Sequence, residues 1–352
     1  MVVDPRDIDV IAPNFKRRLS GVTSTIIQLV PKQRETGLRI AVLGPGLPPH
    51  LPHLRYRDIP LLWRRPRGGG ERVWHARRNT EMLAGLVLRD VLRMKLKLVF
   101  TSASQRHHTR WTKFLIARMD HVISTSRKTA GYMERPSTMI MHGIDTSRFS
   151  PAEDPKAAKR TCGLDPEHRH IGCFGRVRHQ KGTDVFVDAM ICLLPAHPGW
   201  SAVIAGRATA EHRGFERELK EKVEVAGLES RILFVGEHKN IDDWYRALDL
   251  FVAPQRWEGF GLTPLEAMAT AVPVMATDVG AFSELILEGE TGTIIPPGNV
   301  EAMAKAVEPY LDDDRRSKAA ENAVAHARAA FPLELEVEEL RAVYAQAAGR
   351  PL

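Results

Sequence analysis

The stretch WEGFGLTPLEAMAT, residues 257–270, joins two patterns that decide the fold. Before it, DLFVAPQ (residues 249–255) is short and apolar, as is typical of a buried strand. Within it, LTPLEAMATA (residues 262–271) repeats apolar residues at intervals of three and four, which predicts a helix. A glycine-bearing turn therefore links a strand to a helix, and two carboxylates, Glu258 and Glu266, stand there eight residues apart.

The same strand–helix rhythm extends through the second half of the chain. The predicted strands are residues 169–177, 200–206, 231–237, 249–255 and 273–278, and the predicted helices are residues 183–194, 211–227, 241–248 and 262–271. Such alternation indicates an α/β fold in which helices cover both faces of a parallel sheet. Ligands of such sheets bind outside the carboxyl ends of the strands, so we expect the chemistry in the loops that follow them.

The first half repeats the pattern less regularly, and a second Rossmann-like sheet is expected there. The predicted strands are residues 9–15, 38–46, 96–102 and 120–126, with a helix over 22–30. Residues 55–78 depart from the rhythm, with eight arginines, Trp63, Trp74 and three consecutive glycines. A polar connector at 151–160 predicts two domains, 1–150 and 151–330, followed by a helix at 331–352 that returns to the first domain.

Composition restricts the class of protein. The 352 residues are 43% hydrophobic and 26% charged, as in globular domains, and the sequence has no apolar run of the roughly 20 residues that a membrane-spanning helix needs. The first residues lack the basic and apolar regions of a signal peptide, so we expect a protein that is not exported. Three cysteines without metal-ligand spacing are interpreted as buried thiols, which favours the cytoplasm.

Charge is distributed unevenly between the two halves. Residues 1–150 hold 27 Lys and Arg against 11 Asp and Glu, a net charge of +16, and residues 151–352 hold 23 against 32, a net charge of −9. A basic half suits nucleic acid, an anionic membrane or an anionic acceptor. Charge alone leaves these three partners open.

Two loops of the second half carry groups that suit a nucleotide. In GRVRHQKG, Gly175 and Arg176 close a strand and Lys181 and Gly182 open a helix, so a diphosphate can approach the backbone and two cations. After residue 257, amides near the helix start form an anion cradle, contributed by Gly259, Phe260, Gly261 and Leu262. Glu258 at its rim can accept from sugar hydroxyls, and Glu266, one to two turns into the helix, can accept from a ribose.

Taken singly, these residues are also typical of solvated loops and helix starts. Their combination resembles the family 4 glycosyltransferases, retaining enzymes of the GT-B fold, in which two Rossmann-like doubly wound domains face a central cleft. The resemblance rests on the E-x7-E spacing of Glu258 and Glu266, on GR…KG, on HGIDTSRFSP at 142–151 and on TGTIIPPGN at 291–299, and it covers nearly the whole chain.

The resemblance implies roles for the matched positions. Arg176 and Lys181 are expected to clamp the donor diphosphate, Glu258 to contact the donor sugar and Glu266 to bind the ribose. Gly21, in KRRLSGVTST, resembles the family's glycine loop that faces the donor phosphate, although Ser20 stands where the family often has a second glycine. The family commonly places a histidine near 102–104, where this chain has serines; His107 and His108 are candidate replacements, or polar loop residues without a catalytic part.

A mechanism without a metal follows from these assignments. Charge that develops on the leaving diphosphate would be stabilised by Arg176, Lys181 and the cradle amides. The resemblance implies that the reaction occurs on one face of the sugar, with the departing phosphate taking the acceptor's proton. The aspartates at 7–9 and 312–314 are interpreted as solvated acids rather than as metal ligands.

Within the family the chain looks most like the bacterial lipopolysaccharide core mannosyltransferases, on the run PQRWEGFGLTPLEAMA and the basic first half. The resemblance implies GDP-mannose as donor, a lipid-linked anionic saccharide as acceptor, and a peripheral location at the cytoplasmic face of the inner membrane. We expect the first domain to face the membrane and to bind the acceptor. The predicted membrane or acceptor contacts are Trp63, Arg64, Arg65, Arg67, Arg72 and Trp74.

Alternatives from other classes carry weaker signals. A glycosyltransferase with another donor, or with a glycolipid or polysaccharide acceptor, shares every motif above, and a GT-B nucleotide-sugar epimerase shares the architecture. A nucleic-acid-binding protein is suggested by a sequence pI near 9.4, but no zinc-finger, RNP or basic-zipper pattern is present in the sequence. An NAD enzyme is disfavoured because GPGLPP after a predicted strand is not the G-x-G-x-x-G that opens a helix.

Overall fold

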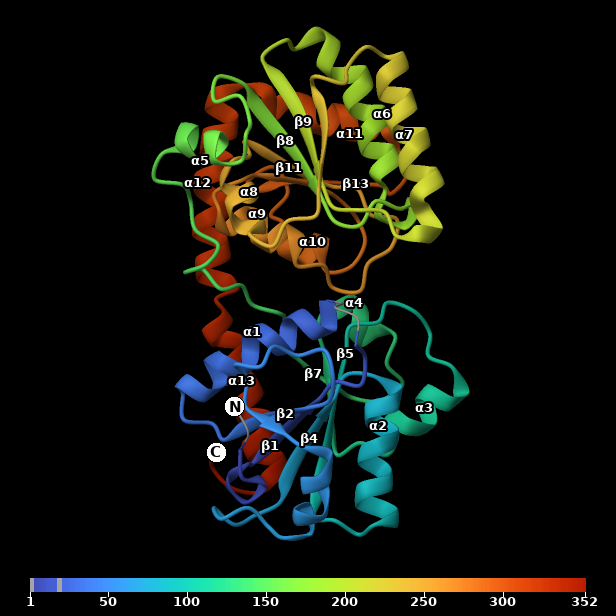
Figure 1. Cartoon of the computed structure of the whole chain (residues 1–352), viewed down its shortest axis with the longest axis vertical. Coiled ribbons are helices and arrows are strands. Elements are labelled where there is room, and N and C mark those ends of the chain that lie inside the picture. Colours follow the sequence, from blue (N-terminus) through green and yellow to red (C-terminus); the bar gives the residue numbers. More distant parts are fainter. Residues whose placement is uncertain (1–2, 18–20) are drawn as a thin grey trace. The chain divides into compact units, whose positions relative to one another are not determined.

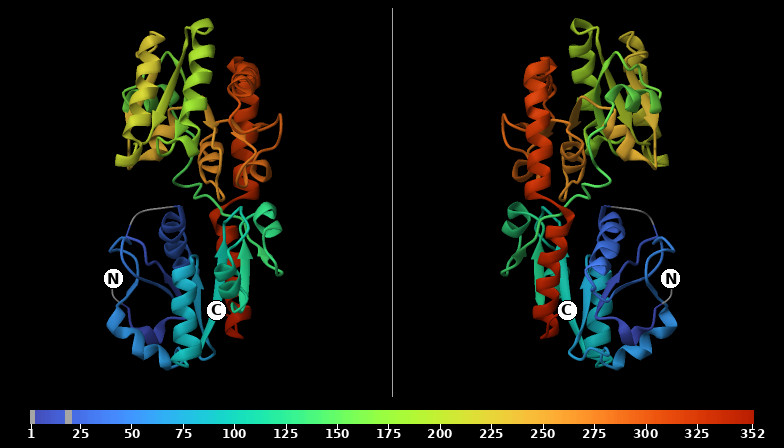
Figure 2. Two further views of the ribbon diagram at one scale, coloured as in Figure 1. Left: turned by 90° about the vertical axis from the view of Figure 1, so that its right-hand side faces the viewer. Right: turned by 90° about the vertical axis from the view of Figure 1, so that its left-hand side faces the viewer.

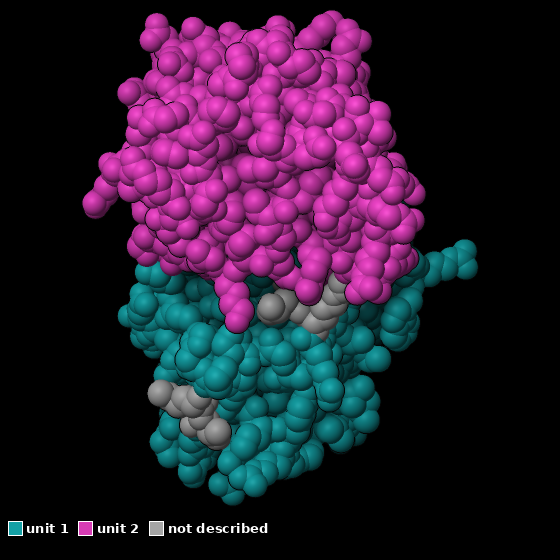
Figure 3. Space-filling view, turned by 45° about the horizontal axis from the view of Figure 1, so that its top comes forward, with its two compact units in different colours: residues 1–143, 333–352 teal, residues 144–332 magenta. Residues whose placement is uncertain are grey.

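The computed structural model describes residues 3–17 and 21–352 and divides into two compact units, coloured separately in Figure 3. Unit 1 comprises residues 1–143 and 333–352, and unit 2 comprises residues 144–332. The chain leaves unit 1 before the polar connector because Ile144 already pairs within unit 2, where its amide donates to the Phe331 carbonyl at 2.9 Å and it bridges to Pro332.

Unit 1 is a parallel sheet of seven strands in the order β3-β2-β1-β4-β5-β6-β7. The strands are β1 Val10–Pro13, β2 Ile40–Leu43, β3 His53–Leu54, β4 Arg72–Ala76, β5 Leu96–Ser102, β6 His121–Ser124 and β7 Thr138–Met139. The α-helices are α1 Gly21–Glu35, α2 Asn79–Leu86, α3 Arg110–Ile116, α4 Arg127–Gly131 and α13 Leu333–Ala348. A 3-10 helix, η2 Tyr56–Trp63, and a π-helix, η3 Val87–Val91, complete the elements used below.

The alternation of side chains along the strands of unit 1 supplies both faces of its sheet. Val10 and Val73 pack with α1 and α13, whereas Ile11 and Trp74 point to the opposite face, which α2 and α3 cover. Figures 1 and 2 show these helices on the two sides of the sheet. Because successive side chains point to opposite faces, an apolar strand between two helical layers is buried on both sides.

Unit 2 is a parallel sheet of six strands in the order β10-β9-β8-β11-β12-β13. Its strands are β8 Arg169–Phe174, β9 Trp200–Ala205, β10 Ile232–Gly236, β11 Leu250–Ala253, β12 Val274–Thr277 and β13 Gly292–Ile295. Its α-helices are α5 Pro155–Thr161, α6 Thr183–Leu193, α7 Arg213–Val225, α8 Ile241–Arg246, α9 Thr263–Ala269, α10 Phe282–Leu285, α11 Val300–Val307 and α12 Asp313–Ala330. The predicted doubly wound α/β architecture is confirmed in both units.

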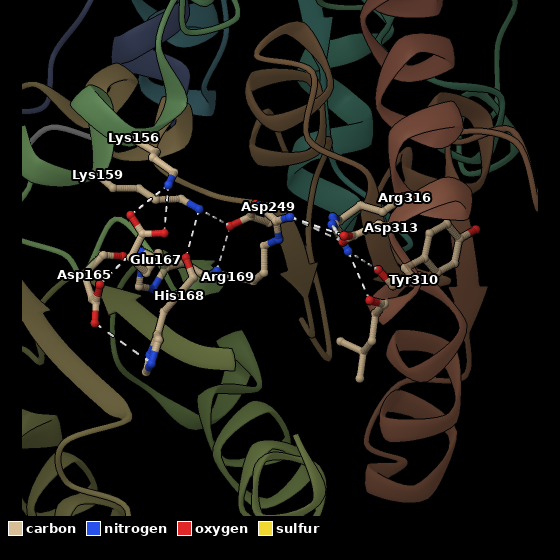
Figure 4. Close-up of polar contacts among 12 residues, drawn as sticks. Lys156, Lys159, Asp165, Glu167, His168, Arg169, Asp249, Tyr310, Asp313 and Arg316 are labelled. Atoms are coloured by element: carbon tan, nitrogen blue, oxygen red, sulfur yellow. Dashed lines mark hydrogen bonds and ion pairs between the residues drawn. The ribbon is translucent and has the colours of Figure 1, made fainter. Parts of the chain in front are cut away.

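Ion pairs hold the amino-terminal end of the unit 2 sheet (Figure 4). Lys159 of α5, almost fully buried, places its ammonium 2.8 Å from the Asp249 carboxylate and donates to the His168 carbonyl at 2.9 Å. Arg169, which begins β8, lies 3.4 Å from Asp313 at the start of α12. Because a buried lysine is tolerated only when paired, this network fixes α5, β8 and α12 at the edge opposite the carboxyl ends of the strands.

Candidate functional site

The sheet order of unit 2 has one topological switch, between β8 and β11. From β8 the chain builds outward to β9 and β10, and it then returns to β11 and builds outward in the other direction. The loops that follow β8 and β11 therefore diverge at the carboxyl edge of the sheet, and the crevice between such loops is where open α/β sheets bind ligands. Both loops selected from the sequence, around Lys181 and around Glu258, leave these two strands.

The loop after β8 approaches its neighbours at distances that only glycine allows. Gly175 has a φ of +142°, and Arg176 follows it directly. Gly182, with a φ of +69°, precedes the first residue of α6, and a Cβ atom there would lie 1.9 Å from the Pro254 carbonyl oxygen at the end of β11. The glycine therefore lets the Lys181 turn, which spans His179–Lys181, pack directly against the neighbouring strand.

Arg256 ties the two loops together. Its amide donates to the Gln180 carbonyl at 3.0 Å, and its guanidinium makes two 2.7 Å hydrogen bonds to the Asp184 carboxylate on α6. Burial alone would raise the pKa of Asp184, but the bonds from Arg256 hold it below its ordinary value. Sequence reasoning missed this pair because the partners are 72 residues apart and neither has a local signature.

Lys181 and Glu258, predicted to have separate roles, form an ion pair. The Lys181 ammonium donates to Glu258 Oε2, and the Gly259 amide donates to Glu258 Oε1 at 3.0 Å. Both side chains are about one-fifth exposed, so the pair is open to an incoming ligand. A Cβ atom on Gly261 would lie 2.3 Å from the Phe282 ring, so glycine keeps the turn tight behind the pair.

Glu266 lies in the first turn of α9, and its carboxylate has one protein partner described. The Tyr245 hydroxyl on α8 donates to Glu266 Oε2 at 2.8 Å. Burial raises the pKa of Glu266, and the Tyr245 hydrogen bond opposes that rise. The Tyr245 ring is fixed by Phe174 and Phe251, with ring centroids at 4.8 and 5.3 Å. Tyr245 was not predicted, because no local motif marks it.

A second polar cluster lies at the corresponding switch of unit 1, between β1 and β4. Arg78 Nη1 donates to Asn14 Oδ1 and to Glu81 Oε1, each at 2.8 Å, and Arg78 Nη2 donates to Thr23 Oγ1 at 3.2 Å. Glu81 is fully buried and also accepts from the Arg77 amide at 2.8 Å. This cluster was missed because β4 itself was not predicted.

The other predicted residues of unit 1 stay predictions. Gly21 begins α1 and is exposed, whereas Ser20 lies outside the described residues. Ser102 ends β5. His107 is exposed against the Tyr132 ring at a centroid distance of 5.2 Å, and burial lowers the pKa of His108.

The structure contradicts the membrane role predicted for Arg72 and Trp74. Arg72 is fully buried in β4, and its guanidinium donates to four backbone carbonyls, those of Pro5, Ile8, Leu62 and Arg64. Burial lowers its pKa to about 10. Trp74 is 1% exposed and donates to the Glu81 carbonyl at 2.9 Å. Both residues belong to a central strand, so neither reaches a membrane.

The remaining residues of that stretch lie at the surface. Trp63 is 48% exposed, and its indole nitrogen donates to the Leu92 carbonyl at 2.6 Å. Arg64 and Arg65 are exposed, and Arg67 pairs with Asp7 at 2.7 Å. Their contact with a membrane or acceptor stays a prediction.

Two further expectations are wrong in part. Asp9, read as a solvated acid, is buried and accepts from Arg39 at 2.7 and 3.0 Å. Among the cysteines, Cys173 is buried, which raises its pKa to about 12, but Cys192 is exposed.

Within residues 3–17 and 21–352, no group of three His, Cys, Asp or Glu side chains is placed to hold a metal ion. No helix in this described part of the chain is long and apolar enough to cross a membrane.

Known proteins are similar to this chain over nearly its whole length. Residues 168–313 match the family model of the glycosyl transferases group 1. A lipopolysaccharide core biosynthesis mannosyltransferase, LpsB of Rhizobium meliloti (strain 1021), is 64% identical over 97% of this chain and 99% of its own length. LpcC of Rhizobium leguminosarum bv. viciae, with the same description, is 55% identical over 97% of both chains.

A solved structure shows the same fold. Anabaena Alr3699/HepE, crystallised in complex with UDP, matches 96% of this chain and 100% of its own with a TM-score of 0.83 at 20% identity. These findings confirm the family resemblance drawn from the E-x7-E and GR…KG motifs.

Proposed function

The chain belongs to the lipopolysaccharide core mannosyltransferases of glycosyl transferases group 1, and from this premise we propose that it uses GDP-mannose and retains the anomeric configuration. The proposed acceptor is a lipid-linked, anionic lipopolysaccharide core saccharide. The names of the two relatives support mannose and the core acceptor. The guanine nucleotide and the stereochemistry come from the family resemblance.

The observation that carries the proposal is the convergence of four side chains at the switch between β8 and β11. Lys181 pairs with Glu258, and Tyr245 donates to Glu266, whose pKa the nearby charge of Lys181 also lowers. We assign the donor diphosphate to Arg176 and Lys181, the donor sugar to Glu258 and the ribose hydroxyls to Glu266. Glycine amides at 259 and 261 supply further donors near the start of α9.

The ion pair suggests how the donor engages the site. Without donor, the Lys181 ammonium is neutralised by Glu258. A diphosphate carries more charge than one carboxylate, so it competes for Lys181 and frees Glu258 to accept from sugar hydroxyls. Arg176 and Lys181 then stabilise the charge that builds on the leaving phosphate as the bond to the sugar breaks. The acceptor hydroxyl attacks from the same face and gives its proton to that phosphate.

The basic unit 1 provides the acceptor half of the proposal. Cations follow β1, β4, β5 and β6, either in the loops or at the start of α4, namely Lys16, Arg17, Arg77, Arg78, Arg106, Arg127 and Lys128. Of these cations, Arg78 is paired with Glu81 of α2. Because the carboxyl ends of parallel strands share one edge, these cations favour an anionic saccharide there over a neutral one. We place the protein at the cytoplasmic face of the inner membrane, where such acceptors are lipid-linked.

A donor screen tests the proposal. Radiolabelled GDP- and UDP-sugars are incubated with the protein and with lipopolysaccharide precursor extracted from a strain that lacks this activity. Label should pass from GDP-mannose to the precursor, and EDTA should leave the rate unchanged because Arg176 and Lys181 take the place of a metal. Transfer from a UDP-sugar instead would replace the donor assignment, and isomerised free donor without transfer would indicate an epimerase.

A further inference from the structure

Helix α3 of unit 1 presents aromatic rings to solvent. Its inner face, Thr112, Leu115 and Ile116, is buried against the sheet. Its outer face carries Trp111, 49% exposed, and Phe114, 45% exposed. The two rings stack, with centroids 5.5 Å apart and planes 14° from parallel. Two large stacked rings held at the surface are costly in water and indicate a contact surface.

Cations surround this aromatic pair. Residues 103–118 contain four Lys and Arg residues and two histidines, and no Asp or Glu. The Arg118 guanidinium lies 3.6 Å from the Phe114 ring centroid, and Arg106 and Arg110 are exposed at the start of the segment. Lys113 pairs with Glu134, so part of the charge is compensated. The segment is still strongly positive around an apolar centre.

We propose that this outer face of α3, centred on Trp111 and Phe114, is the surface by which the protein docks on an anionic lipid bilayer. Aromatic rings settle at the level of the lipid headgroups, while guanidinium groups meet the lipid phosphates. The partner is a membrane and not a second copy of the chain, because two such faces would bring their cations together.

Helix α3 lies near the edge of the unit 1 sheet where the acceptor is proposed to bind. The helix begins eight residues after Ser102, which ends β5 at the carboxyl edge of the unit 1 sheet. That edge holds the cations assigned above to the anionic acceptor. Docking through α3 would therefore bring the acceptor edge to the surface in which a lipid-linked acceptor is anchored. This step rests on the proposed function, whereas membrane docking itself does not.

The exposed rings of Tyr56 and Trp63 lie on η2, which precedes β4 and is therefore at the edge of the sheet opposite the acceptor cations. An aliphatic row elsewhere on unit 1 fits a bilayer less well. Leu83, Val87 and Val91 form an aliphatic row on α2 and η3. The cation beside this row, Arg89, is engaged by Asp90 and Asp120 at 2.6 and 2.8 Å. The row lacks the aromatic rings that interfacial segments combine with cations.

The test measures binding of the full chain to vesicles of phosphatidylcholine with and without phosphatidylglycerol. Trp111→Ser with Phe114→Ser should weaken binding about tenfold or more. Arg110→Gln with Arg118→Gln, which changes two exposed cations of the α3 segment, should weaken binding to anionic vesicles by about fivefold for each charge at low salt. The matched control, Arg217→Gln with Val225→Ser, changes exposed residues on α7 of unit 2 and should bind as the unaltered protein does.

Each variant is also assayed for thermal unfolding, GDP binding and transfer to a delipidated acceptor, all of which should be unchanged. Vesicle binding that survives both double substitutions would overturn the proposal. Loss of transfer to the delipidated acceptor with intact vesicle binding would also overturn it, because the rings would then contact the saccharide. Intact vesicle binding with no transfer by the unaltered protein would refute the proposed function and leave the docking surface standing.

Discussion

Replacing Tyr245 by phenylalanine isolates the ribose assignment of Glu266. The substitution removes one hydroxyl and keeps the ring, which is buried against Phe174 and Phe251. What is lost is the hydrogen bond to Glu266 Oε2 at 2.8 Å. Because the ring stays in place, the change acts on the charge state of Glu266 more than on packing.

The size and sign of the effect follow from linkage. A hydrogen bond to a charged group is worth about 1.5–3 kcal/mol, and each 1.4 kcal/mol corresponds to about one pKa unit. Burial already raises the pKa of Glu266 above 4.5, and the variant loses the bond that opposes this rise. An ionised carboxylate accepts from both ribose hydroxyls more strongly than a protonated carboxyl, which keeps one good acceptor oxygen. GDP affinity should fall at low pH as Glu266 is protonated, and this fall, the acid limb of the affinity profile, should begin at a higher pH in Tyr245→Phe.

The pH dependence that Glu266 gives to fold stability is opposite to the one it gives to GDP binding. With a folded pKa above the unfolded value, the folded state keeps the Glu266 proton over a range where the unfolded state has released it. The stability that this carboxyl contributes is present below the unfolded pKa and is lost as pH rises through the folded pKa. Because Tyr245→Phe raises the pKa of Glu266 further, the stabilisation from this carboxyl should persist to a higher pH in the variant.

The assay is calorimetric titration of GDP into both proteins from mildly acidic to neutral pH, with thermal unfolding measured alongside. Glu266→Gln is the control, since its GDP affinity should be weak and lack this acid limb. An acid limb that stays in place in Tyr245→Phe, with lower thermal stability, would refute the reasoning. The bond would then serve the fold alone, and Glu266 would not bind the ribose.

Three further substitutions test separate parts of the account. Lys181→Ala should weaken GDP affinity by about 1.5–3 kcal/mol and slow turnover, and unchanged donor kinetics would rule out the diphosphate role. Arg72→Met should lower the free energy of urea unfolding by about 3 kcal/mol or more, because each buried carbonyl left without a donor costs about 1–3 kcal/mol; a normal unfolding midpoint would contradict its buried role. Gly182→Ala should lower the free energy of unfolding by about 1–2 kcal/mol, because alanine is strained in the left-handed backbone conformation of this residue. It should also weaken GDP binding, since the new methyl group meets the Pro254 carbonyl and displaces the loop; full GDP affinity would show that the loop spacing is unimportant.

Local signals in the sequence were sufficient for most of the fold and for the donor loops. Strands such as β5 and β11 are short apolar runs, and the turn after each is marked by polar residues or glycine. Gly182 and Glu258 were found because a strand, a glycine turn and a helix start follow each other within a few residues. Family resemblance then supplied roles that spacing alone left open.

Contacts between distant residues could not be predicted. Strand β4 was missed because Arg72 and the glycines before it are typical of a surface loop. The Arg72 guanidinium can be buried only because backbone carbonyls up to 67 residues away accept hydrogen bonds from it. The misassigned membrane role of Trp74 follows from the same error. Tyr245 and Glu266 are 21 residues apart on successive helices, and their hydrogen bond exists only once both helices pack on the sheet.

The central claim is that the chain transfers mannose from GDP-mannose with retention, and the anomeric configuration of the product tests it most directly. The protein is incubated with isotope-labelled GDP-α-mannose and lipopolysaccharide core precursor, and the glycosidic carbon of the purified product is examined by NMR. The account predicts a labelled α-mannoside, formed slowly or not at all by Lys181→Ala. A β-mannoside would contradict retention, and an unlabelled precursor would contradict GDP-mannose as the donor.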